Sequence, residues 1–198
     1  MIDLTPELIC GRGSRRTCYR HPESADRCIK ISTGTPASIR QERREARYMR
    51  WLEKRGYAFT HVPKYYGPED TSLGIGHVFE LVRDHGGEVS KSVMHYLHIE
   101  TEFSIDLMAQ LQRLRRHMRQ HRLMVYDFSD CNMMWQRLAG NQRRLMLIDG
   151  VGDTSPFLFL NLHRGIHGRK LDRRWLRPER VLWGPLRNNI CNQRRTAA

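Results

Sequence analysis

The chain has 198 residues, of which 39% are hydrophobic and 28% are charged. This balance supports one domain, or two small lobes, around a buried core, and it argues against wholesale disorder. No apolar run approaches the ~20 residues that cross a bilayer, and the N-terminus lacks the basic and apolar regions of a secretory signal. We therefore expect a soluble intracellular protein without a transmembrane segment, and secretion by a signal-less route stays open.

The formal net charge is +13, and it is unevenly distributed. From Asn161 onward ten Lys and Arg residues stand against two acids, which places +8 of the total in this basic C-terminal segment. A polyanion is one class of partner for such a surface, and a solvated face or an acidic partner is another. Few aromatic residues lie among these arginines, and no RRM, KH or zinc-finger spacing is present. Nucleic acid is therefore not the partner we expect.

The cysteines and histidines indicate neither a metal site nor a disulfide framework. The five cysteines are odd in number and form no CxxC pair, so we expect free thiols in a reducing compartment. His163 and His167 have the i, i+4 spacing of two ligands on one helix, but nothing nearby in the sequence completes a metal site.

The first structural feature is a glycine-containing hairpin. A short apolar strand over residues 8–10 runs into Gly11-Arg12-Gly13-Ser14, and residues 17–19 resume a β-prone sequence. Because Gly11 and Gly13 carry no Cβ atom, their backbone can lie close to a ligand and their amides can face phosphate oxygens. Taken alone, the same two glycines also fit an ordinary turn.

A lysine and a glutamate follow this hairpin. Lys30 stands among apolar residues in a strand over residues 28–31, where its ammonium must reach solvent or meet an anion. The pattern predicts a helix over residues 38–55 that is ended by Gly56, with Glu45 on its apolar face. Glu45 is the candidate partner of Lys30, and Glu42, one turn earlier, is the alternative.

The middle of the chain predicts a strand, a lobe boundary and a long helix. Residues 76–82 form an apolar strand, and Gly86-Gly87 follows it, so we divide the chain into lobes at residues 1–83 and 84–198. In a kinase the backbone from Glu80 to Val82 would receive the adenine. From residue 100 to about residue 122 apolar residues recur at helical spacing: Phe103, Leu107, Leu111, Leu114 and Met118.

Three polar residues follow that helix with a characteristic spacing. Asp127 and Asn132 frame a loop, and Asp149-Gly150 comes directly after an apolar strand. Kinases use this order, in which one aspartate orients the acceptor hydroxyl while the asparagine and the second aspartate bind Mg²⁺. Mg²⁺ prefers oxygen ligands, so Asn132 and Asp149 are the candidate metal ligands and Asp127 the candidate catalytic residue. Singly, each residue also fits a turn, a cap or a loop contact.

The order of these pieces along the chain is more specific than any one of them. It predicts a phosphotransferase that uses ATP and Mg²⁺, with Lys30 holding phosphates and Glu45 positioning the lysine. The order comprises the Gly11 and Gly13 turn, Lys30, Glu45, Asp127, Asn132 and Asp149.

Nearly the whole chain resembles a known bacterial family. The most specific stretches are residues 11–23 and 27–31, in which Tyr19 is followed by His-Pro-Glu and then by Cys-Ile-Lys, and Glu42-x-x-x-Ala46-x-Tyr48. These stretches are similar to the family called PhoP regulatory network protein YrbL, within the protein-kinase-like superfamily. The resemblance implies an α+β, two-lobed kinase-like fold with a small N-terminal sheet, a reduced helical C-terminal lobe and ATP between them. It also implies a bacterial cytoplasmic protein tied to the response to low magnesium.

The sequence also departs from the larger superfamily. Arg16 stands where a third glycine would complete the loop motif, Ser129 stands where protein kinases carry a lysine, and only 49 residues follow Asp149. A pseudokinase that binds nucleotide or a protein partner without turnover is therefore the second hypothesis. A basic polyanion-binding protein is the third. The acceptor stays open among protein Ser/Thr, a sugar, an aminoglycoside-like amine alcohol and a lipid headgroup.

Overall fold

The computed structural model describes residues 1–97, 103–153 and 163–181. The protein is α+β, and its chain divides into two compact units, Met1–Val89 (unit 1) and Ser90–Ala198 (unit 2). The expected start of the long helix at residue 100, Cys191 and residues 182–198 of the basic C-terminal segment lie outside the described residues.

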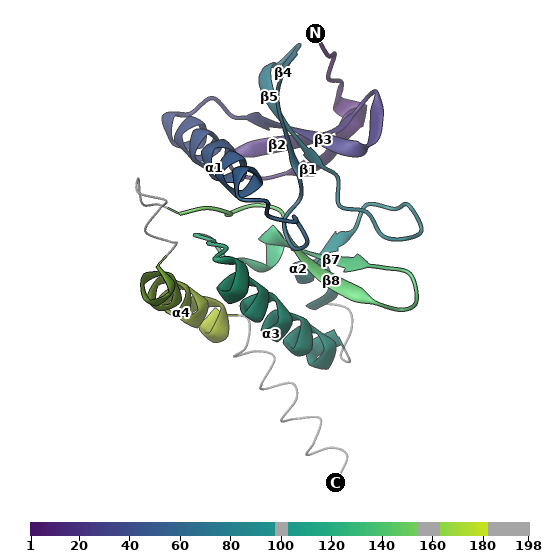
Figure 1. Cartoon of the computed structure of the whole chain (residues 1–198). Helices are drawn as coiled ribbons and strands as arrows, with labels where there is room; N and C mark the ends of the chain where they lie inside the picture. The colour runs from purple at the N-terminus through teal and green to yellow at the C-terminus, as the bar shows by residue number, and fades with distance from the viewer. Residues whose placement is uncertain (98–102, 154–162, 182–198) are drawn as a thin grey trace. The chain divides into compact units, whose positions relative to one another are not determined.

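Unit 1 contains a five-stranded antiparallel sheet in the order β1-β2-β3-β5-β4 (Figure 1). Its strands are β1 (Ile9–Arg12), β2 (Arg16–His21), β3 (Ser24–Ser32), β4 (Tyr65–Thr71) and β5 (Gly74–Glu80). The predicted glycine hairpin is confirmed as the β1–β2 connection. The strand begins one residue later than predicted, because Leu8 ends a 3₁₀ turn (η1, Pro6–Leu8) and donates its amide to Thr5 O at 3.1 Å.

Strand alternation gives this sheet two different faces. On one face Tyr19, Ile29 and Val78 lie side by side across three strands, and they pack with Leu4 and Ile31 in a buried apolar cluster. Gly76 borders this cluster, and a Cβ atom there would overlap Ile29 Cγ2. The opposite face carries Cys18, Lys30 and His77 in register, and α1 lies against this polar face.

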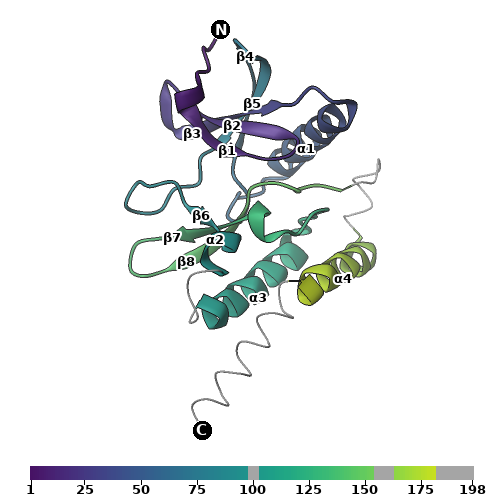
Figure 2. The same ribbon diagram turned by 180° about the vertical axis from the view of Figure 1, so that it is seen from behind.

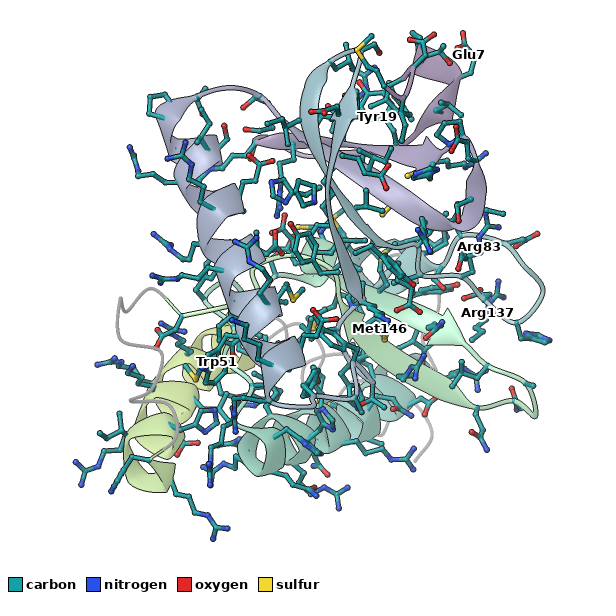
Figure 3. The ribbon with its side chains drawn as sticks, turned by 45° about the horizontal axis from the view of Figure 1, so that its top comes forward. Glu7, Tyr19, Trp51, Arg83, Arg137 and Met146 are labelled. Carbon is teal, nitrogen blue, oxygen red and sulfur yellow. The ribbon has the colours of Figure 1, made fainter. Side chains whose placement is uncertain are left out.

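Helix α1 (Pro36–Lys54) forms as the sequence predicts. Thr35 caps it by accepting the Ser38 amide at 3.2 Å, and Gly56 follows its last turn with φ +66°. Its predicted inward stripe is confirmed, since the following residues are all buried: Glu45, Ala46, Tyr48, Met49 and Leu52. Trp51 stacks on Tyr48 with ring centroids 5.3 Å apart (Figure 3).

Unit 2 combines helices with a three-stranded antiparallel sheet in the order β6-β7-β8. Its elements are β6 (Lys91–Ser92), α2 (Val93–Leu97), α3 (Phe103–His121), η2 (Asp130–Asn132), β7 (Met133–Arg137), β8 (Arg143–Leu147) and α4 (Arg164–Val181). The predicted α3 stripe is confirmed at Leu107, Leu111, Leu114 and Met118, which are at most 1% exposed, while the side chain of Phe103 lies outside the described residues. Met146 on β8 is buried as well (Figure 3).

Helix α4 has no counterpart among the predicted elements. Its sequence is dominated by arginine, and only Leu171 and Trp175, one turn apart, bury large apolar side chains among its described residues. Figures 1 and 2 show α3 and α4 side by side. His167 of α4 hydrogen-bonds with Leu123 O at 3.2 Å, just beyond the end of α3.

A buried carboxylate joins α4 to the segment after β8. Asp153 is 1% exposed, and its two oxygens accept from Lys170 Nζ at 2.8 Å and Arg174 Nη2 at 3.0 Å. Arg174 also donates to Val125 O at 3.1 Å. Asp172 is the exposed counterpart of Asp153. It also pairs with two cations, Arg115 and Arg119, but it is 43% exposed.

No helix within the ranges that the structure describes is long and apolar enough to cross a membrane.

Candidate functional site

Lys30 lies in the middle of the sheet of unit 1. It occupies β3, with Cys18 of β2 on one side and His77 of β5 on the other. The residue is 8% exposed, and its ammonium lies 4.2 Å from the centroid of the Phe79 ring. The predicted position, a lysine in a half-buried strand among apolar neighbours, is confirmed.

Glu45 forms a buried ion pair with Arg16. The Arg16 side chain at the start of β2 is 6% exposed and that of Glu45 is 1% exposed, and the two are joined by Arg16 Nη1 and Glu45 Oε2. The other oxygen, Glu45 Oε1, is buried and has no hydrogen-bond partner among the residues that the structure describes. The ionic contact between Glu45 and Lys30 stays a prediction, and Arg16 is the cation that the structure places on this carboxylate.

The strand pattern of the sequence places Arg16 on the same face as Lys30, but it does not identify Arg16 as the partner of Glu45. Arg16 shares the strand parity of Cys18, and its partner across β3 is Ser32, so it lies on the same face as Lys30. Two cations therefore lie on the face that α1 covers. Only the packing of α1 decides which of them meets Glu45, because strand periodicity places side chains on a face without choosing their partners.

Glu42, the alternative partner, lies beside His77. The two side chains approach within 3.7 Å, from Glu42 Oε1 to His77 Nε2, which is beyond hydrogen-bond range. Burial raises the pKa of Glu42, whereas burial and the nearby Arg16 lower the pKa of His77 to about 4. The imidazole is therefore neutral at pH 7, and its Nδ1 is hydrogen-bonded with the Tyr65 hydroxyl at 2.7 Å.

Acidification is expected to destabilise the protein through His77. Its folded pKa of about 4 lies below the ordinary 6.5, so between these values the unfolded chain binds a proton that the folded chain does not. The contribution of neutral His77 is complete above pH ~6.5 and is lost as the pH falls toward ~4, which amounts to about 2–3 kcal/mol. The raised pKa of Glu42 acts in the opposite direction and offsets part of this loss. Urea unfolding across this pH range measures the net effect.

The control for this prediction is His77→Asn, which keeps a hydrogen-bonding group near Tyr65 but does not titrate in this range. The variant should show a shallower loss of stability on acidification than the unaltered chain. His167, whose pKa is also lowered by burial, remains in both proteins, so its contribution cancels. An equal pH dependence in the two proteins would exclude His77 as its source.

The glycine turn and the expected adenine-binding strand also lie in unit 1. Gly13 donates its amide to Arg16 O at 2.9 Å, which closes the turn. An added Cβ atom would make only ordinary contacts at Gly11 or Gly13, the nearest at 3.7 and 3.6 Å, so the hairpin itself does not require glycine there. At the end of the strand, the Glu80 amide donates to Lys64 O at 2.9 Å, and the Leu81 amide donates to Asp26 O at 2.8 Å. Val82, the last residue of the expected adenine-binding segment, is buried.

In unit 2 the structure brings Asp127 and Asn132 into direct contact. Asn132 Nδ2 donates to Asp127 Oδ2 at 3.1 Å, and Asp127 is exposed. Asn132 ends η2, and its carbonyl accepts the Ile148 amide at 3.0 Å. This backbone contact ties the loop to the end of β8, one residue before Asp149.

Asp149 and Gly150 lie against the same loop. The Gly150 carbonyl accepts the Tyr126 amide at 2.7 Å, and the Gly152 amide donates to Met124 O at 2.8 Å. Asp149 Oδ1 accepts the amide of Gly150 at 2.6 Å. The two segments therefore run side by side, and the three polar residues predicted from their spacing lie on adjoining pieces of backbone.

An aromatic contact holds the loop to α4. The Phe128 ring meets Trp175 edge-on, with centroids 5.1 Å apart, and Trp175 is 1% exposed. The sequence provides no sign of this contact because the two residues are far apart in the chain. Its effect is to fix the backbone directly after Asp127.

Gly150 is the position where the site depends most on the absence of a side chain. It has φ +71°, and a Cβ atom there would lie 2.9 Å from Asp127 Cβ and overlap Asp127 O. Gly150→Ala is expected to lower the free energy of unfolding by about 2–4 kcal/mol, the sum of left-handed strain and overpacking. Urea unfolding measures the loss.

Gly140→Ala is the matched control. Gly140 has nearly the same conformation, φ +65°, but an added Cβ atom there would meet nothing within 4 Å among the described residues. Its loss should be about 1 kcal/mol from the left-handed strain alone. Equal losses at the two positions would show that the contact between Gly150 and Asp127 does not constrain the site.

The oxygen atoms of Asp127, Asn132 and Asp149 are suited to a hard cation. Carboxylate and amide oxygens are the ligands Mg²⁺ prefers, and it usually completes its coordination with waters and substrate phosphates. In the described ranges no three or more His, Cys, Asp and Glu side chains gather into a metal cage. Asp127, Asn132 and Asp149 offer oxygen ligands of the kind that a hard cation takes.

Comparisons with known proteins agree over almost the full length. Residues 2–181 match the model of the family described as PhoP regulatory network protein YrbL. "Uncharacterized protein YrbL" of Escherichia coli (strain K12) is 27% identical over 180 residues, which cover 89% of this chain and 86% of that protein. The protein of the same name from Shigella flexneri has the same identity and coverage. The chain therefore belongs to the PhoP regulatory network protein YrbL family.

Proposed function

We propose that this protein binds ATP with Mg²⁺ and transfers the γ-phosphoryl group to a hydroxyl acceptor, as a regulatory protein of the PhoP network in the bacterial cytoplasm. The observation that carries the proposal is the assembly of Asp127, Asn132 and Asp149-Gly150 in unit 2. Their spacing follows the kinase pattern, and their backbones are hydrogen-bonded to one another. A protein-kinase-like fold is part of the same proposal.

The roles in unit 2 follow from the chemistry of each side chain. Asn132 and Asp149 supply an amide oxygen and a carboxylate for Mg²⁺, which, when bound, neutralises the charge on the β- and γ-phosphates. Asp127 is exposed and accepts a hydrogen bond from Asn132, so its carboxylate is held in one orientation. It accepts or orients the proton of the acceptor hydroxyl.

The transfer step balances with these groups alone. The acceptor oxygen bonds to the γ-phosphorus as the bond from that phosphorus to the β,γ-bridging oxygen breaks, and ADP carries the released charge. The hydroxyl proton passes to Asp127 or to solvent. In this scheme Asp127 is the catalytic residue, and the acceptor is any hydroxyl compound that reaches it.

Unit 1 supplies the phosphate-binding groups of the proposal. Lys30 lies on the third strand and Glu45 on the helix that follows, which are the positions of the phosphate-binding lysine and its glutamate in kinases. Gly11 and Gly13 are exposed, and the hairpin does not need them for its own packing. Because neither residue carries a side chain, phosphate oxygens can approach the backbone of this turn closely.

The Arg16–Glu45 ion pair favours a second candidate function. Kinases need the ion pair between the strand lysine and the helix glutamate in place for catalysis, and here Glu45 is bound to Arg16. Arg16 also stands where a third glycine would complete the phosphate-binding loop, so a buried cation there favours a nucleotide-binding regulatory module without phosphoryl transfer. The two candidates share ATP binding and differ in turnover.

Labelled ATP separates these candidates. We expect the purified chain to melt at a higher temperature with ATP and Mg²⁺, by mass action, and to incorporate label from γ-labelled ATP. Lys30→Met and Asp149→Asn should each reduce both signals. Lys54→Met, which replaces an exposed lysine at the end of α1, is the control and should leave both signals unchanged.

The outcomes distinguish the candidates cleanly. Stabilisation by ATP without incorporated label, including with a panel of hydroxyl acceptors, would establish the regulatory module. Absence of both signals in a folded chain would overturn ATP binding and with it both candidates. An effect of Lys54→Met equal to that of Lys30→Met would show that lysine 30 has no specific role.

A further inference from the structure

Three cysteines lie on one face of the sheet of unit 1, and none of them has a role in the proposed function. Cys10, Cys18 and Cys28 belong to the adjacent strands β1, β2 and β3 (Figure 1). All three are free thiols, with Cys10 and Cys18 half-buried and Cys28 buried. The sulfurs of Cys10 and Cys18 are 3.5 Å apart.

A β-bulge brings Cys10 to Cys18. Ile9 pairs with Tyr19 and Gly11 with Cys18, so Cys10 and Gly11 together lie opposite one residue. As a result Cys10 Sγ reaches both Cys18 Sγ and the Cys18 carbonyl oxygen, each at 3.5 Å.

We propose that Cys10 and Cys18 form a reversible intramolecular disulfide, which makes the glycine hairpin a site of oxidative modification. A disulfide needs its sulfurs about 2.05 Å apart and its Cα atoms closer than about 7 Å. The bulge lays Cys10 beside Cys18 on the neighbouring strand, and side-chain rotation of the two cysteines closes the remaining distance from the 3.5 Å between their sulfurs.

The register disfavours the other available pair. Cys18 pairs with Lys30, and Cys28 pairs with Arg20, so Cys18 and Cys28 are diagonal neighbours. Diagonal Cα atoms in a sheet are about 7–8 Å apart, at or beyond the limit for a disulfide. Cys28 is also buried, so a dissolved oxidant reaches it less readily.

The crosslink joins the two strands that flank the turn at Gly13.

The disulfide forms by thiol–disulfide exchange, with a low-molecular-weight disulfide as the oxidant. One cysteine, as thiolate, attacks a sulfur of the oxidant and forms a mixed disulfide while one small thiolate leaves. The second cysteine then displaces the other small thiolate, so the protein loses two protons and two electrons and the oxidant becomes two thiols.

The reaction is expected to be slow at neutral pH. The hydrogen bond with Cys18 and burial raise the pKa of Cys10. The hydrogen bond with Cys10 lowers the pKa of Cys18, but a hydrogen bond with Cys28 and burial outweigh it and raise that pKa to about 12. The thiolate is the attacking form, so the rate of oxidation should rise with pH between about 7 and about 9. The equilibrium position is set separately, by how closely the folded hairpin holds the two sulfurs.

Peptide mapping after redox titration tests the proposal. The reduced full-length chain is equilibrated with mixtures of oxidised and reduced glutathione, the remaining thiols are alkylated, and trypsin is added without reductant. Trypsin cleaves after Arg12, Arg15 and Arg16, so a disulfide should join peptide 1–12 to peptide 17–20. Alkylated thiols should fall from five to three and return to five with dithiothreitol.

Serine variants provide the controls. Cys10→Ser and Cys18→Ser should each abolish the loss of two thiols, whereas Cys28→Ser and the exposed-site variant Cys131→Ser should retain it. A crosslink from peptide 17–20 to peptide 28–30, glutathione adducts alone, or only intermolecular dimers would each overturn the assignment. None of these readouts involves ATP, so the result stands apart from the proposed function.

Discussion

Replacing Asp153 with alanine is expected to lower the free energy of unfolding by about 3–5 kcal/mol, because the change removes a buried carboxylate that pairs with two cations. Asp153 is 1% exposed and binds both Lys170 and Arg174, which are only 19% and 18% exposed. The same substitution frees the segment after Asp149 from α4. Urea unfolding monitored by circular dichroism measures the loss.

Asp172→Ala is the matched control for this effect. Asp172 also binds two cations, Arg115 and Arg119, but it is 43% exposed and its partners are 36% and 50% exposed. Solvent screening should limit its cost to about 0–1 kcal/mol. If the two aspartates cost the same, burial would not be what makes the Asp153 network important.

Replacing Asp127 with asparagine is expected to reduce phosphoryl transfer by roughly 10²- to 10⁴-fold, which is the usual contribution of a positioned general base. The thermal stabilisation by ATP and Mg²⁺ should be retained, because the proposal assigns metal binding to Asn132 and Asp149. Label incorporation and melting temperature, measured on the same preparation, report the two properties separately.

Asp130→Asn controls for the effect of removing a charge from this loop. Asp130 lies three residues after Asp127, and its Oδ1 accepts the Cys131 amide at 3.0 Å, a contact that an asparagine oxygen can also make. This variant should transfer phosphate at close to the original rate. Full activity in Asp127→Asn, or an equal loss in Asp130→Asn, would contradict the catalytic assignment of Asp127.

Much of the local structure could be predicted from the sequence, because it depends on residues close together in the chain. The end of helix α1 follows from Gly56, and its apolar stripe correctly placed Glu45 in the interior. The α3 stripe was equally clear. Helix α4 was missed because its arginine-rich sequence buries little apolar surface within the described residues, and two apolar side chains one turn apart do not make a readable pattern.

The sequence identified which residues make up the candidate site, but it did not identify the contacts that these residues make. The spacing of Asp127, Asn132 and Asp149 placed them at the ends of neighbouring elements, and the structure brings them together. The partner of Glu45 and the contact of Phe128 with Trp175 were not predictable. Both contacts join residues that are distant in the chain, so they depend on how elements pack.

The sequence by itself therefore determined the secondary-structure elements that carry the candidate residues, and the family to which the chain belongs. Periodicity, capping and turn chemistry act over a few residues, and a linear pattern records them fully. Only the tertiary structure decided that Arg16 binds Glu45, that Asp153 is buried between two cations, and that a bulge brings Cys10 to Cys18. In each case several residues of similar chemistry are possible partners. The packing of the helices and strands determines which of them come close enough to make contact.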